Sequence, residues 1–385
     1  MRIGLDGMPL NQQLTGVGHY TLELARAMAQ ASPDDEFEIV SPQPYVFEES
    51  KGRDGLPANV ALARSRTGFM TRRWWSIGLP RYLEKEPVDL FHGTNFEVPL
   101  WAKPKCATVL TVHDLSQLLY PDTHEARHVR RARRRLPLMT RAATMIITPT
   151  ESVRKEVCEH LQIARKKVVT VSEATREVFR PMSAEKARTA RKQLRVSDEF
   201  VLFVGTIEPR KDLQTLLRAF ERVAHARNSL QLVVTGKMGW LFDDLLEQIR
   251  NSKVRDRIKL TGYLNDEELR ALYSSCRAFV YPSIYEGFGL PPLEAMACGA
   301  PVIASRIDSI VEVCGDAALL IEPKSVGSLA SAIDKVVDDE SFRTKLSSAG
   351  RARASDFSWK RTAELTRAVY EEAMKRFSRN ARMKI

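Results

Sequence analysis

The sequence predicts an α/β protein built from two doubly wound domains, each with a parallel sheet. Short apolar runs alternate with segments such as 212–226, whose apolar residues recur every three to four positions. This alternation is typical of parallel sheets that are covered by helices on both faces. The chain has 385 residues, and 44% of them are hydrophobic. A chain of this length is too long for one compact core and long enough for two.

Short apolar runs mark the expected strands. Their number is too great for one small sheet, and no short-period repeat accompanies them. In chain order they are Arg2–Leu5, Phe37–Val40, Val88–His92, Thr108–Val112, Thr144–Thr148, Val168–Val171, Phe200–Val204, Leu230–Thr235, Arg257–Leu260, Ala278–Tyr281, Pro301–Ala304 and Ala318–Ile321.

The domain boundary is expected after the motif Phe179-Arg180-Pro181. A polar, charged helical segment follows it, and the next strand starts at Phe200. We therefore expect Rossmann-like domains at 1–180 and 181–357. The last segment, 358–385, has the spacing of an amphipathic helix, and we expect it to pack back on the first domain.

The composition excludes several classes of protein. No apolar run approaches the length of about 18 residues that a membrane-spanning helix needs. The five cysteines lack metal-ligand spacing and the N-terminus starts as a strand, which predicts a reduced, cytoplasmic protein without a signal peptide. The formal net charge of +11 is spread over both halves and indicates a general attraction to anions rather than a nucleic-acid-binding tail.

A glycine-rich loop follows the expected strand Ala278–Tyr281 and is the most informative part of the chain. Gly287 and Gly289 allow the backbone to approach a ligand closely. Paired prolines then suit the first turn of a helix, where an N–H group would be unpaired anyway, and Gly299 ends that helix. Free N–H groups at a helix start bind anions, so we expect a phosphate here.

Two glutamates flank this anion site. Glu286 lies in the loop and Glu294 lies in the expected helix, with seven residues between them. A carboxylate is a poor phosphate ligand, but it accepts hydrogen bonds from sugar hydroxyls. The pair therefore predicts a bound phosphate with hydroxyl groups on either side.

Polar and glycine-rich groups follow several other expected strands. In doubly wound sheets, ligands bind beyond the carboxyl ends of the strands. One such group alone is weak evidence, but recurrence at equivalent positions predicts a ligand site. The groups are Thr15-Gly16-Val17-Gly18, His113-Asp114, Gly205 with Glu208-Pro209-Arg210-Lys211, and Gly236-Lys237-Met238-Gly239.

Arg210 and Lys211 are two cations at one strand end, opposite a helix start that also favours negative charge. Together these groups predict a diphosphate site that needs no metal ion. The paired acids Asp243-Asp244 and Asp338-Asp339 lie in helix-like segments rather than in loops, so neither a metal nor a cofactor is expected.

These segments resemble the family-4 (group 1) retaining glycosyltransferases of the GT-B fold, and among them the mannosyltransferase-like branch. The resemblance covers essentially the whole chain and is most specific around the two glutamates. One departure is 171–175, where the family often carries a Pro-Asn-Gly-Val-Asp type of turn. The matching segments are Glu286–Ser305, Val204–Thr206, Pro209–Leu213, Gly4–Asp6, Thr15–Tyr20, Val112–Leu115 and Phe357–Trp359.

The resemblance implies a role for each matching residue. Glu286 would hold the donor sugar hydroxyls, and Glu294 would hold the nucleotide ribose. Arg210 and Lys211 would bind the diphosphate and stabilise the charge of the leaving group, with His113 near the reacting centre. The donor site would further include Gly287, Phe288, Gly289, Leu290, Gly205 and Gly236, while Gly16 and Gly18 would line the cleft from the first domain.

The implied reaction moves a hexose from a GDP-mannose or UDP-sugar type of donor to a glycan or polyprenyl-linked acceptor. The configuration would be retained, and no metal would be required. Residues 1–180 would serve the acceptor, and residues 181–357 would bind the donor.

Each of these residues also has a purely structural interpretation. Glu294 suits the first turn of any helix, and Arg210 and Lys211 could form a solvated loop pair. His113 could be a buried histidine with satisfied hydrogen bonds, and the glycines of the first loop could only shape a turn. Their common position at strand ends favours the functional interpretation.

A basic cluster spans residues 127–141, with seven arginines and no acid. Such runs are commonly solvated helix faces. Basic residues also attract acidic lipid head groups, each by about 1 kcal/mol near the surface. We therefore expect this face to rest on the anionic inner leaflet of a membrane or to guide a polyprenyl-diphosphate acceptor. The residues concerned are Arg127, Arg130, Arg131, Arg133 and Arg134.

Alternative functions predict different sequence features. A non-catalytic nucleotide-sugar-binding protein would lack donor residues that are present here, and a sugar-nucleotide epimerase of the same fold is a further alternative. A nucleic-acid binder would interleave aromatic residues with basic ones, and none accompany the basic cluster. Nucleic acid is therefore not an expected partner.

Overall fold

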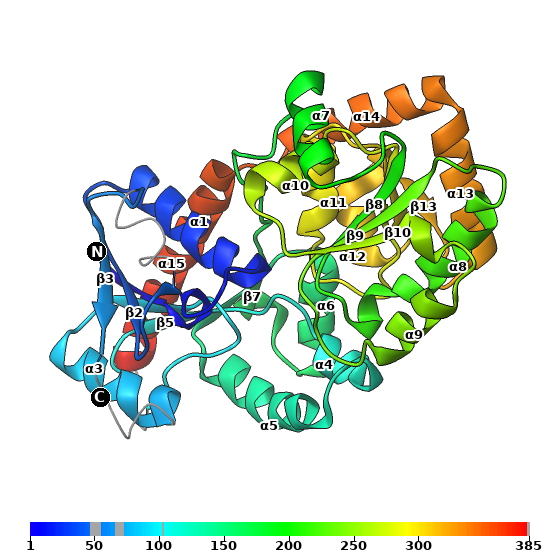
Figure 1. Ribbon diagram of the computed structural model, residues 1–385. Helices are drawn as coiled ribbons and strands as arrows, with labels where there is room; N and C mark the ends of the chain where they lie inside the picture. The colour runs from blue at the N-terminus through cyan, green and yellow to red at the C-terminus, as the bar shows by residue number, and fades with distance from the viewer. Residues whose placement is uncertain (47–54, 66–72, 102–103, 383–385) are drawn as a thin grey trace. The chain divides into compact units, whose positions relative to one another are not determined.

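The chain forms two units, each around one parallel sheet (Figure 1). The computed structural model describes residues 1–46, 55–65, 73–101 and 104–382, so the end of the predicted C-terminal segment, 383–385, lies outside the described residues. The two sheets confirm the predicted fold class of two doubly wound α/β domains. The first unit contains Met1–Leu115, Arg130–Glu173 and Ser358–Ile385, and the second contains Ser116–Val129 and Ala174–Phe357.

The first sheet has seven strands: β1 (Arg2–Asp6), β2 (Glu36–Ser41), β3 (Val60–Arg64), β4 (Leu90–Gly93), β5 (Ala107–Thr111), β6 (Met145–Thr148) and β7 (Val168–Thr170). Their order is β3-β2-β1-β4-β5-β6-β7, and every neighbouring pair is parallel. Every residue of β5 is buried. Because side chains alternate between the two faces of a strand, both faces of the sheet are covered there.

The described helices of the first unit lie between its strands in the chain, apart from the C-terminal one. They are η1 (Met8–Leu10), α1 (Gly16–Ala31), the π-helical turn η3 (Trp74–Gly78), α3 (Leu79–Lys85), α5 (Ala126–Ala142, which enters the unit at Arg130), α6 (Glu151–His160), η5 (Arg165–Lys167) and α15 (Trp359–Arg382).

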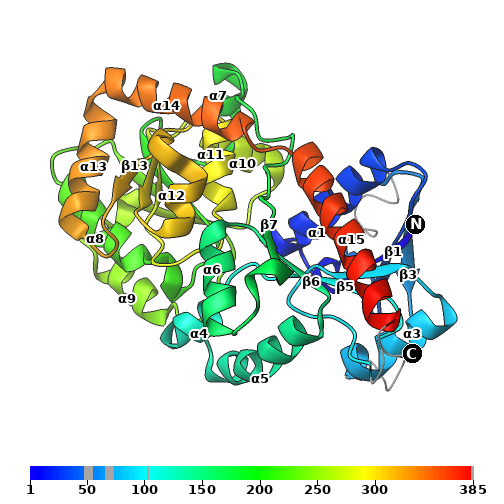
Figure 2. The same ribbon diagram turned by 180° about the vertical axis from the view of Figure 1, so that it is seen from behind.

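The C-terminal helix α15 lies against α1 within the first unit (Figure 2). Its Tyr370 is fully buried, and the hydroxyl lies 2.7 Å from Nδ1 of His92. Nε2 of His92 lies 2.8 Å from the hydroxyl of Thr111. On the outside, Arg367 donates a hydrogen bond to Ser32 at 2.7 Å. These contacts fasten the last helix to the sheet and to the end of α1.

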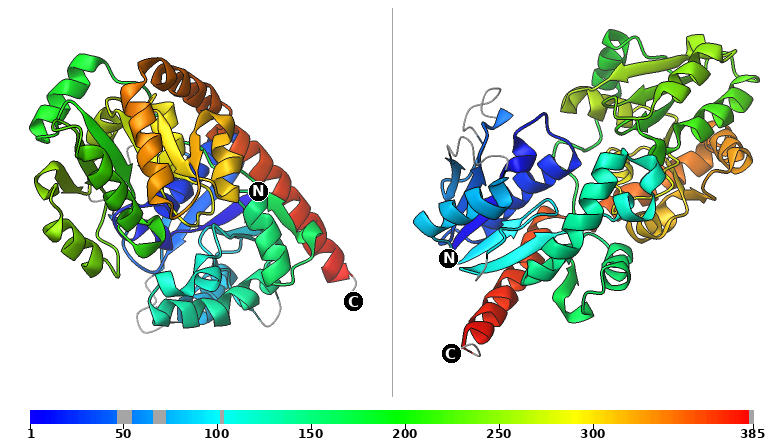
Figure 3. Two further views of the ribbon diagram at one scale, coloured as in Figure 1. Left: turned by 90° about the vertical axis from the view of Figure 1, so that its right-hand side faces the viewer. Right: turned by 90° about the horizontal axis from the view of Figure 1, so that it is seen from below.

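The second sheet has six strands: β8 (Phe200–Val204), β9 (Gln231–Thr235), β10 (Ile258–Gly262), β11 (Ala278–Tyr281), β12 (Val302–Ser305) and β13 (Leu319–Ile321). Their order is β10-β9-β8-β11-β12-β13, and every neighbouring pair is parallel. All residues of β8, β11 and β12 are buried, so helices must cover both faces, as the views in Figure 3 show.

The described helices of the second unit pack on this sheet through apolar stripes. In the helix that follows β8, Leu213, Leu216, Leu217 and Phe220 recur at helical spacing and are buried. The helices and turns are α4 (Ser116–Leu119), η4 (Pro121–Thr123), α7 (Ala184–Gln193), η6 (Pro209–Lys211), α8 (Leu213–Ala224), α9 (Asp243–Asn251), η7 (Arg255–Arg257), α10 (Asp266–Tyr273), α11 (Leu290–Ala297), α12 (Asp308–Cys314), η8 (Gly315–Ala317), α13 (Val326–Asp338) and α14 (Glu340–Ser355).

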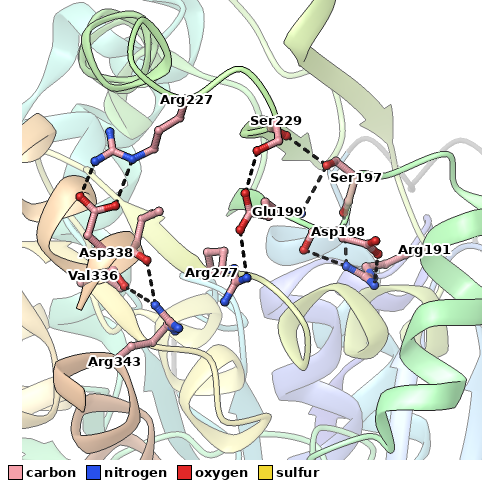
Figure 4. A network of polar contacts seen from close by, with 11 residues as sticks. Arg191, Ser197, Asp198, Glu199, Arg227, Ser229, Arg277, Val336, Asp338 and Arg343 are labelled. Atoms are coloured by element: carbon pink, nitrogen blue, oxygen red, sulfur yellow. Dashed lines mark hydrogen bonds and ion pairs between the residues drawn. The ribbon is translucent and has the colours of Figure 1, made fainter. Parts of the chain in front are cut away.

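A polar network joins the amino ends of strands in the second sheet (Figure 4). Glu199, just before β8, accepts hydrogen bonds from Ser229 at 2.7 Å and from Arg277 at 3.0 Å. Ser229 precedes β9 and Arg277 precedes β11, so three neighbouring strand starts are tied together. Beside them, Arg191 donates to Asp198 at 2.6 Å. The network lies at the edge of the sheet opposite the one where ligands are expected.

Each predicted strand is present, with small shifts at its ends. Strand β3 was not predicted. It is short, lies at the edge of the first sheet, and has no buried residue. Residues 60–63 form a short apolar run, so the sequence does carry a signal for this strand, which the prediction overlooked.

Candidate functional site

The loop between β11 and α11 is shaped by Gly289. This glycine precedes α11 with a φ of 108°, in the left-handed region that glycine adopts without strain. A Cβ atom here would lie 2.6 Å from Cδ1 of Ile310, so a larger residue would also collide with its neighbour. Prolines occupy the first turn of α11. The local sequence therefore dictates both the tight approach of the loop and the start of the helix.

Glu286, in this loop, pairs with two cations from the loop after β8. Its Oε2 accepts a hydrogen bond from Arg210 at 2.9 Å, and its Oε1 accepts one from Nζ of Lys211. Lys211 also donates to the hydroxyl of Tyr281 at 2.7 Å, and Arg210 donates to Glu208 at 2.7 Å. Glu286 is only 8% exposed and Lys211 only 7%. Because the sequence predicts that a donor binds here, we call Glu208, Arg210, Lys211 and Glu286 the donor cluster.

Arg210 also holds the backbone of the Glu286 loop. Its guanidinium donates to the carbonyl oxygen of Tyr285 at 2.9 Å, and its own carbonyl oxygen accepts from the N–H of Ile284 at 2.9 Å. From the other side, the hydroxyl of Ser309 donates to the carbonyl oxygen of Glu286 at 2.6 Å. These hydrogen bonds to the main chain of the loop fix the position of Glu286.

The turn η6 presents Arg210 and Lys211. It ends at Asp212, which has a φ of 48° and accepts a hydrogen bond from the N–H of Thr215 at 3.3 Å as the N-cap of α8. Aspartate tolerates this left-handed conformation because its short side chain bonds locally to the backbone. The cap places the two cations directly before the helix.

The electrostatics of the donor cluster keep Glu286 charged. Burial alone would raise the pKa of Glu286, but Arg210 and Lys211 together lower it to about 2. The carboxylate is therefore ionised at neutral pH and only accepts hydrogen bonds. This is the chemistry needed to bind hydroxyl groups.

Gly205 and Gly236 bring two strand ends into close backbone contact beside the donor cluster. A Cβ atom on Gly236 would lie 1.9 Å from the carbonyl oxygen of Gly205, and φ at Gly236 is 143°. A Cβ atom on Gly205 would lie 3.8 Å from Cε of Lys211. Glycine at position 236 therefore has a packing reason that the sequence alone did not reveal.

Glu294, in α11, has different surroundings from Glu286. Its Oε2 accepts a hydrogen bond from the hydroxyl of Tyr273 at 3.2 Å. Burial raises the pKa of Glu294 to about 7, while Arg176, which is paired with Asp266 at 2.6 Å, acts in the opposite direction. The two glutamates of the motif therefore differ electrostatically: the pKa of Glu286 is lowered to about 2, and that of Glu294 is raised to about 7.

The other predicted residues of this loop pack inward. Phe288 is 5% exposed, and its ring meets the ring of Phe357 edge to face at 5.8 Å. Leu290 is partly buried against the core of the second unit, and Gly287 joins Glu286 to Phe288. The loop thus offers the Glu286 carboxylate and backbone groups rather than apolar side chains.

His113 belongs to the first unit and follows β5. Its Nε2 donates to the carbonyl oxygen of Thr94 at 2.8 Å, and its Nδ1 lies 3.1 Å from the carboxylate of Glu173. Burial alone would lower the pKa of His113, but the hydrogen bond and charge of Glu173 raise it above its usual value. Both ring nitrogens thus have acceptors inside the first unit.

The glycine loop and Asp6 also belong to the first unit. Gly16 is the first residue of α1 and is exposed, whereas Gly18 is buried and a Cβ atom on it would lie 3.0 Å from the carbonyl oxygen of Pro9. Asp6, at the carboxyl end of β1, is fully buried and accepts a hydrogen bond from the N–H of Met8 at 2.9 Å. Burial raises the pKa of Asp6 to about 8.

The basic cluster lies on α5. Arg131 and Arg135 both pair with the buried Glu97, so part of the cluster is neutralised within the first unit. In the part of the chain that the structure describes, no helix is both long and apolar enough to cross a bilayer. The exposed arginines of the cluster are Arg127, Arg130, Arg131, Arg133, Arg134 and Arg141.

Sequence reasoning missed the partners that complete these sites. Glu208 was visible as a charge two residues before Arg210 at a strand end, but no role was assigned to it. The other partners come from distant segments and leave no local signal. They are Tyr281 and Ser309 for the donor cluster, Tyr273 and Arg176 for Glu294, and Glu173 for His113.

Two family models match the chain, "Glycosyl transferases group 1" at residues 185–353 and "Glycosyltransferase Family 4" at residues 14–176. The chain is 30% identical to O-antigen chain mannosyltransferase B of Escherichia coli, over 96% of this chain and 100% of that protein. It is 27% identical to the MMP alpha-(1->4)-mannosyltransferase of Mycolicibacterium hassiacum, over 98% of this chain and 99% of that protein.

The fold is similar to that of HepE of Anabaena, which was solved in complex with UDP and glucose. The TM-score is 0.74 at 18% identity, over 96% of this chain and 99% of that one. Sucrose-phosphate synthase of Thermosynechococcus elongatus gives a TM-score of 0.74 at 22% identity, over 96% and 98%. At such identities the likeness concerns the fold, whereas the full-length match to the Escherichia coli protein concerns the family. The chain belongs to the group 1, or family 4, glycosyltransferases.

Proposed function

We propose that this glycosyltransferase moves a hexose from a nucleotide-sugar donor to a glycan or polyprenyl-linked acceptor. The observation that carries the proposal is the buried contact of Glu286 with Arg210 and Lys211 at the carboxyl edge of the second sheet. Ligands bind at this edge in doubly wound sheets, and two cations suit a diphosphate. Two relatives matched along their full length are named as mannosyltransferases, which favours mannose and makes GDP-mannose the first donor to test.

In this proposal, Lys211 and Arg210 stabilise the charge of the departing nucleoside diphosphate. Fixed, buried cations stabilise developing negative charge without reorganisation, and screening is weak in such surroundings. Glu286 accepts hydrogen bonds from the sugar hydroxyls, and Glu294 accepts them from the ribose. Because the pKa of Glu294 is about 7, donor affinity is expected to fall as the pH drops through neutrality and this acceptor is protonated.

We further propose that transfer retains the configuration of the sugar and needs no metal, since the two cations supply positive charge at the diphosphate. NMR of the product made from an α-linked donor tests retention, and assays with and without a chelator test the metal requirement. An inverted product contradicts the first proposal. Activity that disappears with chelator and returns with Mg²⁺ contradicts the second.

A thermal-shift panel of nucleoside diphosphates and nucleotide sugars tests the donor site, because a ligand of the folded state stabilises it by mass action. Glu286→Ala and Lys211→Ala are each expected to abolish donor hydrolysis and transfer. Glu247→Ala, which changes an exposed glutamate on α9 of the same unit, is the control and is expected to keep full activity. Wild-type turnover in either site variant refutes the assignment.

The same assay separates the alternatives. A nucleotide sugar that stabilises the protein but yields no product with any acceptor favours a binding protein. A donor whose sugar is converted while it stays attached to the nucleotide favours an epimerase.

We also propose that the exposed arginines of α5 attract the anionic head group of the acceptor's carrier lipid at the cytoplasmic face of the membrane. Flotation compares neutral liposomes, neutral liposomes with polyprenyl diphosphate, and anionic liposomes. The test variant is Arg130, Arg133 and Arg134→Ser, which spares the Arg131–Glu97 pair. The control, Lys186, Arg188 and Lys192→Ser, removes three exposed cations from α7. Equal flotation of the two variants contradicts the proposal.

A further inference from the structure

The charged groups of the donor cluster already neutralise one another. Of Glu208, Arg210, Lys211 and Glu286, two are carboxylates and two are cations, and their side chains are between 3% and 12% exposed. A diphosphate entering beside them would add negative charge to a buried group whose net charge is zero. Burying an unpaired charge is unfavourable, so an incoming anion has to replace one that is already there.

The two carboxylates differ in how they are held. Glu286 contacts both cations, which lie in a different loop. It is 76 residues from Arg210 and 75 residues from Lys211 in the chain. Glu208 pairs with Arg210, only two residues further along the same stretch of chain. A local pair keeps its geometry when a side chain of the other loop moves. Glu286 is therefore the carboxylate that can leave.

Each cation keeps a partner when Glu286 leaves. Arg210 retains Glu208 at 2.7 Å, and Lys211 retains the hydroxyl of Tyr281 at 2.7 Å. These partners hold the two cations at the strand end, where they can meet the oxygens of a diphosphate. The exchange therefore leaves both buried cations with hydrogen-bond acceptors throughout.

The backbone of Glu286 does not have to move. Ser309 donates to its carbonyl oxygen at 2.6 Å, and the N–H of Ile284 in the same loop donates to the carbonyl oxygen of Arg210 at 2.9 Å. Neither hydrogen bond involves the Glu286 side chain. The carboxylate can therefore leave the cations by rotation about its side-chain bonds while the backbone stays in place.

We propose that Glu286 is an internal counterion that the donor's diphosphate displaces from Lys211 and Arg210, and that Glu208 is the positioning residue that keeps Arg210 in place. The inference rests on the proposed function, since it takes a nucleotide sugar as the ligand. The displaced carboxylate binds the hydroxyls of the donor sugar. After transfer these hydroxyls are gone, and Glu286 returns to the cations in competition with the nucleoside diphosphate. The exchange thus favours the intact donor over its product and speeds product release.

Titration calorimetry with UDP and GDP tests this exchange in the wild type and in three variants that each remove one negative charge. The diphosphate that the wild type prefers is expected to bind Glu286→Gln about tenfold more tightly, because the competing carboxylate is absent. Glu208→Gln removes a charge from the same cluster but also weakens the local contact that positions Arg210, so weaker binding is expected. Glu247→Gln, on the exposed face of α9, is expected to bind like the wild type.

The outcomes separate exchange from a simple charge effect. Equal tightening in Glu286→Gln and Glu208→Gln would show that only net charge matters and would overturn the proposal, as would unchanged or weaker binding in Glu286→Gln. Binding to none of the four proteins would refute the donor site itself, and the proposed function with it. A crystal structure of the wild type with the diphosphate bound needs no variant: the Glu286 carboxylate is expected to have left Nζ of Lys211, and a retained ion pair contradicts the exchange.

Discussion

The two edges of the second sheet carry the same kinds of charged side chain in opposite surroundings. At the amino edge, Glu199 before β8 pairs with Arg277 before β11 at 3.0 Å, and the side chains are 40% and 37% exposed. At the carboxyl edge, Arg210 and Lys211 after β8 pair with Glu286 after β11, and none of these side chains is more than 12% exposed. The same two strands thus begin with a solvated ion pair and end with a buried one.

This difference separates a surface contact from a site. An exposed pair stabilises the folded state by only about 0–1 kcal/mol, because water solvates the separate charges nearly as well. A buried pair gives little net stability, since the loss of hydration offsets the attraction, yet removing one partner costs about 3–5 kcal/mol. Buried charges that do not serve stability point to a ligand, and perturbed pKa values such as that of Glu286 accompany them.

The largest effect is expected for Lys211→Ala at the carboxyl edge. It removes a cation from the proposed diphosphate site and is expected to abolish measurable transfer, a loss of at least about 100- to 1,000-fold in rate. It also leaves Glu286 with Arg210 as its charged partner in the cluster, so the free energy of unfolding should fall by up to about 3–5 kcal/mol. Chemical denaturation and a transfer assay measure the two losses. Loss of stability with a normal transfer rate would show that the ion pairs at the carboxyl edge, like the pair at the amino edge, have only a structural role.

The next effect concerns the backbone of the carboxyl edge. Gly236→Ala places a Cβ atom 1.9 Å from the carbonyl oxygen of Gly205, and we expect the free energy of unfolding to fall by about 2–4 kcal/mol. Gly262→Ala is the matched control, because Gly262 ends β10 with a φ of 73° in open space. Its expected cost is about 1–2 kcal/mol, from backbone strain alone. Equal losses by denaturant titration would show that the close approach of the two strand ends is unimportant.

Asp6→Asn extends the comparison to a buried carboxyl group at the carboxyl edge of the first sheet. Burial raises the pKa of Asp6 to about 8 in the folded protein, and Glu97 adds to the rise, whereas the unfolded value is near 4. The folded state therefore binds the proton more tightly, and wild-type stability is expected to decrease as the pH rises from about 4 to 8.

Asparagine does not titrate, so the Asp6→Asn variant lacks this pH-dependent loss of stability. Its melting temperature should therefore rise relative to that of the wild type as the pH increases through this window. Thermal unfolding of both proteins between pH 5 and 8 measures the gap, with buffers matched in ionic strength. A gap that stays constant with pH would contradict the raised pKa of Asp6.

The smallest effect is expected at the amino edge. Arg277→Ala breaks the exposed pair with Glu199, and the free energy of unfolding should change by less than about 1 kcal/mol. The transfer rate should not change, because this pair lies at the opposite ends of the strands from the donor cluster. A large loss of activity in Arg277→Ala would break the contrast between the two edges.

Much of the fold could be predicted from local patterns. The twelve expected strands are all present because buried parallel strands need apolar runs. Strand β3 was missed although residues 60–63 also form a short apolar run. The segment with Glu286 and Gly289 was recognisable because its glycine and proline positions follow directly from its turn and helix start. The packing requirement at Gly236 was not recognisable from the sequence, because it depends on contact with Gly205 in another loop.

The sequence by itself determined the elements, their parallel arrangement, the family, and the residue types at the strand ends, because periodicity, turn residues and motifs are properties of neighbouring positions. Only the tertiary structure decided that Glu286 neutralises Lys211 and Arg210, that Glu294 has a raised pKa, and that Glu173 holds His113. Ion pairing, burial and pKa depend on distances between segments far apart in the chain, and folding brings those segments together. The donor cluster therefore appears in the sequence as separate charges and in the structure as one group of two carboxylates and two cations.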